Sequence, residues 1–243
     1  MKQQEDRHWR QTAAVFHERA DEYDSWYDDS LLFEIELAAL RAARGNCTGP
    51  GVEVGSGPGR FAAALGIETG IDPAGAPLLK AAGRGVRPVM ALGENLPLAD
   101  NSIGTIYLIL TLCFTADPEA VVRECFRVLR PHGTLILGII PADSVWGKLL
   151  TAKGKAGHPY YRFARLLTVE AATSLLNKSG FSTAGGWSTL YQQPNDLKNR
   201  EKPRPGLDEK SGFSVIVAEK FYQSRPAGHI DRKNASSDDK PQC

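Results

Sequence analysis

The fold is decided by residues 51–59, which read Gly-Val-Glu-Val-Gly-Ser-Gly-Pro-Gly. A short apolar run ends there in a glycine-rich loop, and the residues from about Arg60 to Leu65 are helix formers. This order predicts a strand, a tight loop and a helix. The glycines let backbone amides approach a ligand with no side chain between them. Because ligands bind at the carboxyl ends of strands in an open α/β sheet, this loop is the first candidate for a binding site.

The residues that follow alternate between short apolar runs and helical stretches, which is the pattern of a parallel α/β sheet. Seven strands are predicted, at residues 51–54, 68–71, 87–90, 103–110, 134–140, 183–192 and 213–220. Pro203, Pro205 and Gly206 exclude a crossover helix between the last two, so these should be antiparallel neighbours. We therefore expect an α/β fold with a three-layer, Rossmann-like sheet of about seven strands, mostly parallel with an antiparallel C-terminal strand.

Three further segments surround this predicted core. Residues 1–45 have helical character, with apolar spacing over 9–20 and good helix formers over 31–43. A less regular insert is expected over about 141–165, within a main domain of residues 46–222. Residues 223–243 are polar and contain proline, so we expect them to form a disordered tail.

The charge and hydropathy of the chain limit its partners. There are 29 Lys and Arg residues against 28 Asp and Glu, a formal net charge of +1. No global field therefore attracts nucleic acid, and none is expected as a partner. No apolar run reaches the roughly 20 residues of a transmembrane helix, and the N-terminus has no apolar stretch of a signal peptide. The expected location is the cytoplasm.

The cysteines and histidines do not predict a metal site. Cys47, Cys113, Cys125 and Cys243 show no C-x-x-C spacing, and the five histidines are scattered along the chain. Cys113 and Cys125 lie within apolar patterns, where a free cysteine usually packs as a small hydrophobic residue. No metal is expected.

The glycine loop alone leaves its ligand open. Residues 57–62 satisfy the dinucleotide fingerprint G-x-G-x-x-A, so a nicotinamide or flavin cofactor is one interpretation. Asp72 ends the next predicted strand, where a carboxylate can accept hydrogen bonds from both ribose hydroxyls of NAD or of an adenosine-bearing methyl donor. Two simpler interpretations are that the loop is only a turn and that Asp72-Pro73 caps the next helix.

Several motifs in order resemble those of the class I S-adenosylmethionine-dependent methyltransferases. The match resembles most the branch that holds the quinone-biosynthesis C-methyltransferases and many small-molecule enzymes. It rests on the acidic residue and glycines of 53–59, on Asp72, on residues 93–97 (Gly-Glu-Asn-Leu-Pro) and on residues 129–133 (Leu-Arg-Pro-His-Gly). The antiparallel pair at the end of the sheet is also typical of this family. Gly93 in place of alanine, and His132 in place of glycine, depart from its pattern at two turns.

The resemblance implies S-adenosyl-L-methionine as the cofactor and assigns residues to it. Glu53 would face its ammonium group, an acid that would repel the pyrophosphate of NAD. Gly55, Ser56 and Gly57 would contact the methionine portion, and Asp72 with Pro73 would contact the ribose. Gly93, Glu94 and Asn95 would contact the adenine. Leu110 and Thr111 would border both the cofactor and the acceptor.

The acceptor side has weaker signals. The N-terminal helices resemble the lid of related enzymes, with Tyr23 and Tyr27 facing the cofactor or the acceptor, or simply packing on the core. In the insert, His158 and Tyr160 are the candidate catalytic residues, since a histidine can act as a base near neutral pH. Tyr161 and Cys113 are further substrate-side candidates.

The predicted activity is transfer of a methyl group to a small-molecule acceptor by in-line displacement. This reaction needs the nucleophile and the methyl group held close together, with water excluded, and a base only if the acceptor must lose a proton. Two alternatives remain at this point: an NAD(P)-dependent oxidoreductase, and a non-catalytic methyltransferase-like binding protein. The oligomeric state cannot be read from the sequence.

Overall fold

The computed structural model describes residues 2–45, 47 and 51–221, and the side chains from His8 onward within them. The predicted linker at 48–50 and the predicted tail at 223–243 lie outside the described residues. None of the helices in the described ranges is long and apolar enough to cross a membrane.

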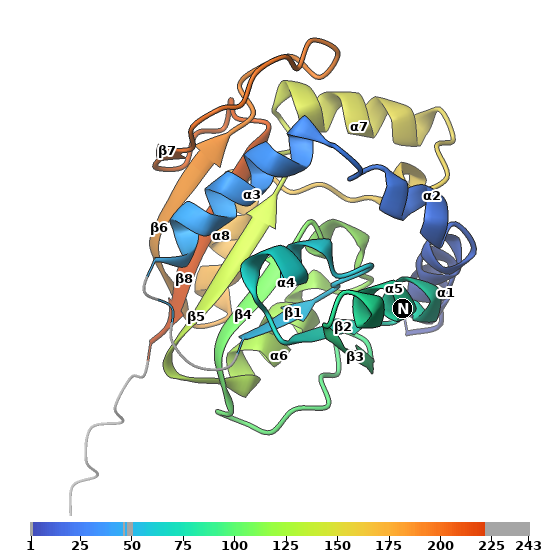
Figure 1. The fold of residues 1–243 in the computed structure, drawn as a ribbon. Helices are drawn as coiled ribbons and strands as arrows, with labels where there is room; N and C mark the ends of the chain where they lie inside the picture. The colour runs from blue at the N-terminus through green and yellow to red at the C-terminus, as the bar shows by residue number, and fades with distance from the viewer. Residues whose placement is uncertain (1, 46, 48–50, 222–243) are drawn as a thin grey trace, which may run out of the picture.

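One eight-stranded sheet forms the centre of the structure, in the order β3-β2-β1-β4-β5-β8-β6-β7 (Figure 1). Strands β1 to β5 are parallel, whereas β8 runs antiparallel between β5 and β6. The predicted α/β class and the antiparallel ending are thus confirmed. The strands are β1 (Gly51–Val54), β2 (Thr69–Asp72), β3 (Arg87–Met90), β4 (Ile103–Ile109), β5 (Leu129–Ile139), β6 (Phe181–Thr189), β7 (Arg204–Pro205) and β8 (Phe213–Lys220).

The strand beyond the seven predicted is β7, in the segment expected to be a plain polar connection. Its two residues pair antiparallel with Trp187 and Ser188 at the edge of the sheet. Pro205 is tolerated at the edge of the sheet, because proline has no N–H group and an edge strand has no further strand that needs a hydrogen bond from it. A two-residue strand forms only because the connection folds back against β6, and so short a strand shows no periodicity in the sequence.

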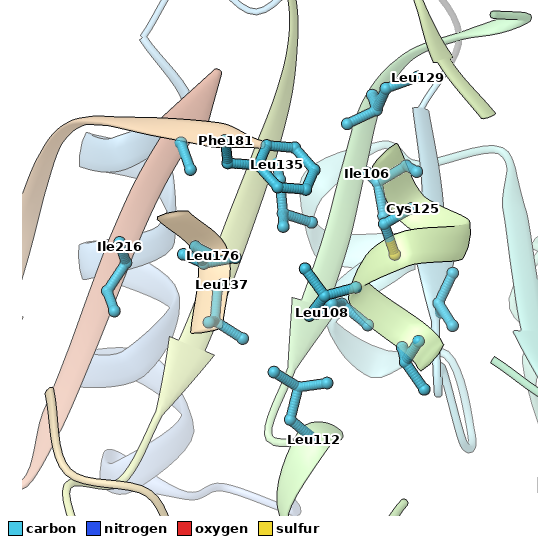
Figure 2. Packing of buried hydrophobic residues seen from close by; sticks show 14 of the residues in the cluster. Ile106, Leu108, Leu112, Cys125, Leu129, Leu135, Leu137, Leu176, Phe181 and Ile216 are labelled. Atoms are coloured by element: carbon cyan, nitrogen blue, oxygen red, sulfur yellow. The ribbon is translucent and has the colours of Figure 1, made fainter. Parts of the chain in front are cut away.

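Helices cover both faces of the sheet, which gives the three expected layers (Figure 1). Most buried side chains of α3 (Leu31–Arg44) and α4 (Arg60–Leu65), with Ala81 of α5 (Gly75–Gly83), join one core cluster, and those of α6 (Pro118–Val128) and α8 (Val169–Lys178) join the other. Successive residues of a strand point to opposite faces. Leu135 and Leu137 of β5 accordingly pack with α6 and α8 (Figure 2), while Ile136 between them packs with α3 and α4.

Several strand boundaries differ from the prediction: β6 spans residues 181–189 and not 183–192, and the start of β5 differs most. Strand β5 begins at Leu129, which pairs with Ile103, and not at Thr134. The register then shifts between Ile103 and Thr105, and His132 has a φ of +61°. Residues 130–133, predicted to separate helix from strand, therefore form an irregularity within the strand.

The insert at 141–165 is more regular than predicted, because most of its first half is helix α7 (Val145–Lys155). Its N-cap is Ser144, whose Oγ accepts a hydrogen bond from the Gly147 N–H at 3.0 Å. A short 3-10 turn, η2 (Tyr161–Phe163), follows and contacts α7. The serine at the N-cap position was a usable signal for this helix.

The N-terminal helices α1 (Lys2–Glu18) and α2 (Ala20–Ser25) lie beside α5, near the carboxyl ends of β1 and β2 (Figure 1). In contrast, α3 packs on the sheet against β5, β6 and β8, and most of its buried residues belong to the core. The predicted helical region 1–45 thus divides into two parts with different surroundings.

Candidate active site

The glycine loop turns sharply at the end of β1. The N–H groups of Gly55 and Ser56 both donate to the carbonyl oxygen of Ile71, at 2.7 and 3.1 Å. Gly55 and Gly57 have φ values of +74° and +50°, which L side chains rarely adopt. These contacts hold the loop against β2 and leave its backbone open at the carboxyl edge of the sheet.

Asp72, at the end of β2, fixes the same loop from the other side. Its Oδ2 accepts from the Gly57 N–H at 2.9 Å, and its Oδ1 accepts from the Ala74 N–H at 2.8 Å. Burial raises the pKa of this carboxyl to about 6, against the lowering effect of the two hydrogen bonds. Each carboxylate oxygen has further lone pairs, so Asp72 can still accept from two hydroxyl groups of a ligand.

A first cavity lies over this loop and encloses about 780 Å³, including the part open to solvent. Its floor is formed by the ends of β1, β2 and β4, and its roof by Trp9, Thr12, Ala13 and Phe16 of α1 with Tyr23 of α2. Eight of the eleven predicted cofactor residues line it: Gly55, Gly57, Asp72, Pro73, Gly93, Glu94, Leu110 and Thr111.

The other three predicted cofactor residues do not line the cavity. The carboxyl of Glu53 is buried near Ala62 of α4, and burial raises its pKa well above the usual range. Ser56 points its hydroxyl toward Gly70, and Asn95 is exposed to solvent. The cofactor contacts predicted for these three residues, through the backbone for Ser56 and directly or through water for Glu53, therefore stay predictions. Sequence spacing places a residue near a site, but strand alternation and loop path decide where its side chain points.

Glu94 uses its carboxylate to hold the segment before α6. Its Oε1 accepts from the N–H groups of Ala116 and Asp117 at 3.2 and 3.4 Å. Leu110, at the end of β4, has a φ of +54°, a conformation that is costly for a branched side chain. Thr111 follows, and its hydroxyl lies within hydrogen-bond distance of two carbonyl oxygens, 3.0 Å from that of Ile109 and 3.1 Å from that of Val54. The strained backbone of Leu110 thus lies at the cavity wall, as strain at functional sites often does.

A second cavity of about 870 Å³, open to solvent in part, adjoins the first. The two share five lining residues: Phe16, Tyr23, Leu110, Thr111 and Phe114. The rest of the second cavity is lined mainly by aromatic and aliphatic side chains from the turn after α2, from α3, from η1 (Leu112–Phe114) and from residues 160–167. A mainly apolar chamber therefore lies next to the cavity over the glycine loop, and the two are bordered by the same five residues.

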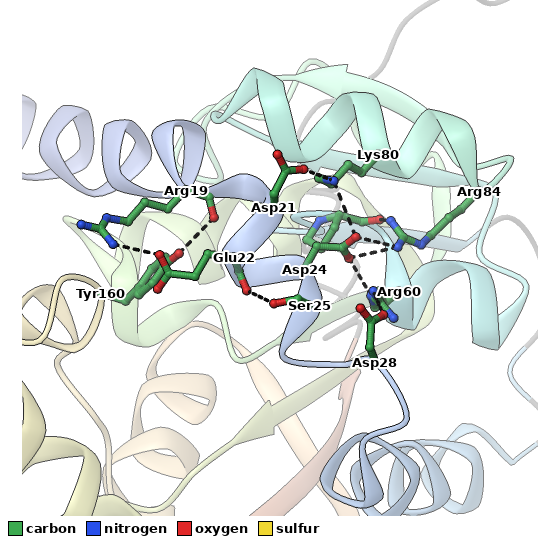
Figure 3. A network of polar contacts seen from close by, with 11 residues as sticks. Arg19, Asp21, Glu22, Asp24, Ser25, Asp28, Arg60, Lys80, Arg84 and Tyr160 are labelled. Carbon is green, nitrogen blue, oxygen red and sulfur yellow. Dashed lines mark hydrogen bonds and ion pairs between the residues drawn. The ribbon is translucent and has the colours of Figure 1, made fainter.

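All but one of the predicted acceptor-side residues line this second cavity, namely Tyr23, Tyr27, Cys113, Tyr160 and Tyr161. Burial raises the pKa of the Cys113 thiol to about 12, and the thiol donates to the carbonyl oxygen of Leu110 at 3.5 Å. A thiol with this pKa is protonated at neutral pH and is a poor nucleophile. The Tyr160 hydroxyl donates to the carbonyl oxygen of Arg19 at 3.0 Å, so it ties η2 to the N-terminal helices (Figure 3).

His158 is the predicted acceptor-side residue that lines neither cavity. Its ring stacks on Tyr161 with centroids 4.5 Å apart, which places it one layer behind the cavity wall. Burial, followed by the nearby Lys153 charge, lowers its pKa. In this position His158 supports the tyrosine that faces the cavity.

Sequence reasoning missed Glu36, which lines the second cavity from α3. The residue is 1% exposed, and its Oε2 has no hydrogen-bond partner within the described residues. Burial raises its pKa to about 8. The signal was available, because Leu32, Glu36 and Leu40 follow one another at helical spacing on the buried face, where an acid is out of pattern.

The N-terminal helices are held over the first cavity by a set of ion pairs (Figure 3). The buried carboxylate of Asp24 accepts from Arg60 Nε at 2.6 Å and from Arg84 Nη2 at 2.8 Å. Lys80 pairs with Asp21 at 2.5 Å. These contacts join α2 to α4 and α5, so the roof of the cavity is fastened to the two helices that follow the ligand-facing loops.

The first cavity fits S-adenosylmethionine. A side chain at Gly55 would fill the space at the loop, since an added Cβ would lie within 3 Å of the Thr111 side chain. The Asp72 carboxylate is positioned to accept from ribose hydroxyls, and Ala91, Leu92 and Gly93 offer an apolar edge to an adenine ring. Within the described residues, no group of three or more His, Cys, Asp or Glu side chains could hold a metal ion.

Known proteins agree with this geometry. Residues 52–137 match the family model described as a methyltransferase domain. The crystal structure of a SAM-dependent methyltransferase from Thermotoga maritima, described as a possible histamine N-methyltransferase, is 32% identical with a TM-score of 0.81, over 86% of this chain and 99% of that one.

Two proteins of undescribed activity are also similar. An uncharacterized protein of Methanocaldococcus jannaschii is 32% identical over 85% of this chain and 99% of its own length. One from Mycobacterium tuberculosis is 34% identical over 90% of this chain and 74% of its own length.

The matched family and the Thermotoga structure favour a methyl donor over a dinucleotide at the glycine loop. The quinone-biosynthesis branch is not singled out by these matches and stays a prediction. The order of strands, the antiparallel β8, the loop at Gly55 and the carboxylate of Asp72 all agree with them. The chain belongs to the class I S-adenosylmethionine-dependent methyltransferases.

Proposed function

We propose that this methyltransferase acts on a small-molecule acceptor held in the second cavity. The observation that carries the proposal is the wall shared by the two cavities, formed by Phe16, Tyr23, Leu110, Thr111 and Phe114. An acceptor in the apolar chamber would meet the methyl donor across this wall, which is the adjacency that an in-line displacement needs.

The proposed cofactor contacts follow from the lining of the first cavity. The backbone of Gly55 and Gly57 would hold the methionine portion, Asp72 the ribose hydroxyls, and the 91–94 segment the adenine. The bound cofactor supplies a methyl group on a sulfonium, which is already a strong electrophile. The contribution of the chain is then to hold the acceptor close, to orient it and to exclude water.

The proposed lid comprises α1 and α2, residues 2–25, and not the whole of 1–45. Side chains of these two helices, including Phe16 and Tyr23, contribute to both cavities, whereas most of the buried residues of α3 pack in the core. The ion pairs of Asp24 would hold the lid closed over bound ligands. A lid that excludes water increases the strength of polar contacts in the site.

Two further observations support a small acceptor. The chamber is lined by side chains of several separate segments, including the lid, which suits a molecule that enters whole. The Thermotoga relative, 32% identical, is described as a possible histamine N-methyltransferase, and histamine is a small molecule. A macromolecular acceptor would have to reach the shared wall through the same enclosure.

The test has two stages. Calorimetry with S-adenosylhomocysteine and with NADH should show binding of the first and none of the second. Turnover is then measured as S-adenosylhomocysteine release with a panel of amines, phenols, thiols and carboxylic acids, and separately with total cellular protein and RNA. Methylation of a small molecule supports the proposal. Methylation confined to protein or RNA would refute the small-molecule acceptor while leaving the methyltransferase assignment intact.

A further inference from the structure

The second cavity contains one carboxyl group, on Glu36, in a wall that is otherwise mainly aromatic and aliphatic. No Lys, Arg or His side chain lines this cavity among the described residues. Glu36 is 1% exposed, and its Oε2 has no hydrogen-bond partner in the same part of the chain. A buried, unpartnered carboxyl destabilises a fold, and an apolar residue would pack better at this place.

The position of Glu36 on α3 argues against a purely structural role. It follows Leu32 and precedes Leu40 on the buried face of the helix, and both neighbours are ordinary apolar packing residues. The exposed acid on the same helix, Glu34, forms an ion pair with Arg200 instead. Glu36 therefore has no partner of its own in the described structure, and its carboxyl faces the chamber in which the acceptor is proposed to bind.

Aromatic rings surround the same space. Phe16, Tyr23, Trp26, Tyr27, Phe114, Tyr160 and Tyr161 all line the cavity. The rings of Trp26 and Tyr160 are in edge contact at 4.8 Å, and Tyr23 joins them at 5.4 and 5.8 Å. The faces of such rings attract cations, most strongly where water is excluded.

The titratable groups that line this cavity together with Glu36 come from several segments. Tyr27 lies in the turn after α2, and Tyr161 in η2; burial, together with the nearby Glu36 charge, raises the pKa of both hydroxyls, that of Tyr161 to about 12. Tyr23, Tyr160 and Cys113 complete the set, and burial raises the pKa of each above its ordinary value. All five stay neutral near pH 7, so none of them supplies a positive charge to Glu36.

We propose that the acceptor is an amine on an apolar scaffold and that Glu36 binds its ammonium group and accepts a proton from it. This inference rests on the proposed small-molecule function and names its substrate class. A protonated amine brings both features that the chamber lacks, a positive charge and N–H donors for the carboxylate. A phenol or alcohol brings a donor without the charge, and a carboxylic acid would repel the ionised Glu36.

The proton transfer makes the acceptor reactive. An ammonium nitrogen has no free electron pair, so it must lose a proton before it can accept a methyl group. The proton passes from this nitrogen to a Glu36 oxygen. The neutral nitrogen then forms the new N–C bond to the methyl carbon as the C–S bond breaks, and the electron pair of that bond stays on sulfur. The products are an N-methylammonium and S-adenosylhomocysteine, and Glu36 releases its proton to solvent.

The test measures proton release on binding, with no turnover. 2-Phenylethylamine, histamine and butylamine are titrated into the protein saturated with S-adenosylhomocysteine, at pH 7, in two buffers of different ionisation enthalpy. A carboxyl with a pKa of about 8 is mostly protonated at pH 7. Binding of an ammonium ion that ionises it should release about 0.9 proton per site, falling toward zero at pH 9.

The variants separate this role from others. Glu36→Gln should abolish the proton release and weaken amine binding at least about tenfold, with S-adenosylhomocysteine binding unchanged as proof of a folded cofactor site. Glu34→Gln, two residues earlier in α3 but exposed and ion-paired, should behave as wild type. 2-Phenylethanol, the neutral analogue, should bind the wild type much more weakly than the amine.

Several outcomes would overturn the inference. These are no binding by any of the three amines, equal binding of 2-phenylethanol and 2-phenylethylamine, or unchanged proton release in Glu36→Gln. If S-adenosylhomocysteine binds and a phenol or thiol is methylated, the amine class and the role of Glu36 fail while the proposed function stands. If no small molecule of any class is methylated, the proposed function itself fails.

Discussion

Gly55 and Thr111 are packed so closely that the glycine cannot carry a side chain: an added Cβ would lie 2.2 Å from Thr111 Cγ2. The contact joins the end of β1 to the residues that follow β4. It brings the glycine loop and the shared cavity wall together at one point. The Thr111 hydroxyl, donating to the backbone of β1 at 3.1 Å, fixes the same junction.

Gly55→Ala should therefore damage the cofactor site. The substitution adds a clash with Thr111 to the strain of a side chain at a φ of +74°. We expect a loss of unfolding free energy of about 1–3 kcal/mol and at least a roughly tenfold weaker binding of S-adenosylhomocysteine, measured by denaturation and calorimetry. Gly83→Ala, in α5 with nothing within 4 Å of the new Cβ, is the matched control and should be neutral or slightly stabilising. Equal behaviour of the two variants would contradict the role given to the junction.

Asp72→Ala should weaken S-adenosylhomocysteine binding by about 2 kcal/mol, because it removes charge-assisted hydrogen bonds to the ribose and frees the Gly57 N–H. Calorimetry at pH 8 measures the change. Asp143→Ala, at an exposed residue that lines neither cavity, should bind like the wild type. Unchanged affinity in Asp72→Ala would mean that the ribose contact is made elsewhere.

The affinity for S-adenosylhomocysteine should fall below about pH 6. Burial raises the pKa of Asp72 to about 6 in the ligand-free protein, and the ribose hydroxyls need the ionised form as acceptor. Protonation therefore competes with binding on the acid side: affinity is steady above pH 6 and is about tenfold lower at pH 5. Calorimetric titrations from pH 5 to 8 test this, and Asp72→Asn should give a flat profile over that range. A flat profile in the wild type would refute the assignment.

Asp24→Asn should loosen the proposed lid. The variant loses the ion pairs of α2 with Arg60 and Arg84, which are mostly buried, at a cost of about 2 kcal/mol. Hydrogen exchange should accelerate in residues 8–25 and stay unchanged in α6 and α8. Glu18→Gln, at an exposed lid residue with no ion pair among the described residues, serves as the control. Equal exchange in both variants would show that Asp24 does not fasten these helices.

Glu36→Gln should stabilise the ligand-free protein more at high pH than at low pH. A carboxyl whose pKa rises from 4.5 to about 8 on folding binds its proton more tightly in the folded state. The wild type therefore loses stability between about pH 4.5 and 8, a loss that the amide does not share. The difference in Tm between variant and wild type should be larger at pH 9 than at pH 5, with Glu34→Gln showing no such trend. A pH-independent difference would mean that Glu36 is not buried as described.

Much of the cofactor half could be predicted from the sequence. The strand, glycine loop and helix of 51–65 are local, and each demands particular residue types at fixed spacing. The antiparallel end of the sheet followed from prolines that exclude a crossover helix. Helix α7 also has a local signal, the N-cap residue Ser144, although the sequence pattern predicts an irregular insert there.

Side-chain direction was harder to predict than position. Glu53 lies two residues before the loop as expected, yet strand alternation points it toward α4 and away from the cavity. Asn95, next to the cavity residue Glu94, faces solvent. His158 and Tyr161 are three residues apart, and packing places only Tyr161 on the cavity wall.

The sequence by itself determined the class of fold and the place of the ligand loop, because those depend on short segments with strong local requirements, and the resemblance of its motifs to a known family implied the cofactor. Only the tertiary structure decided the acceptor chamber. Its wall is assembled from the lid, α3, η1 and residues 160–167, which are distant along the chain. The way these segments pack together decides whether the Glu36 carboxyl is exposed to solvent, is hydrogen-bonded to another side chain or faces an apolar cavity. Burial and the absence of a partner are properties of that packing, and no single stretch of residues encodes them.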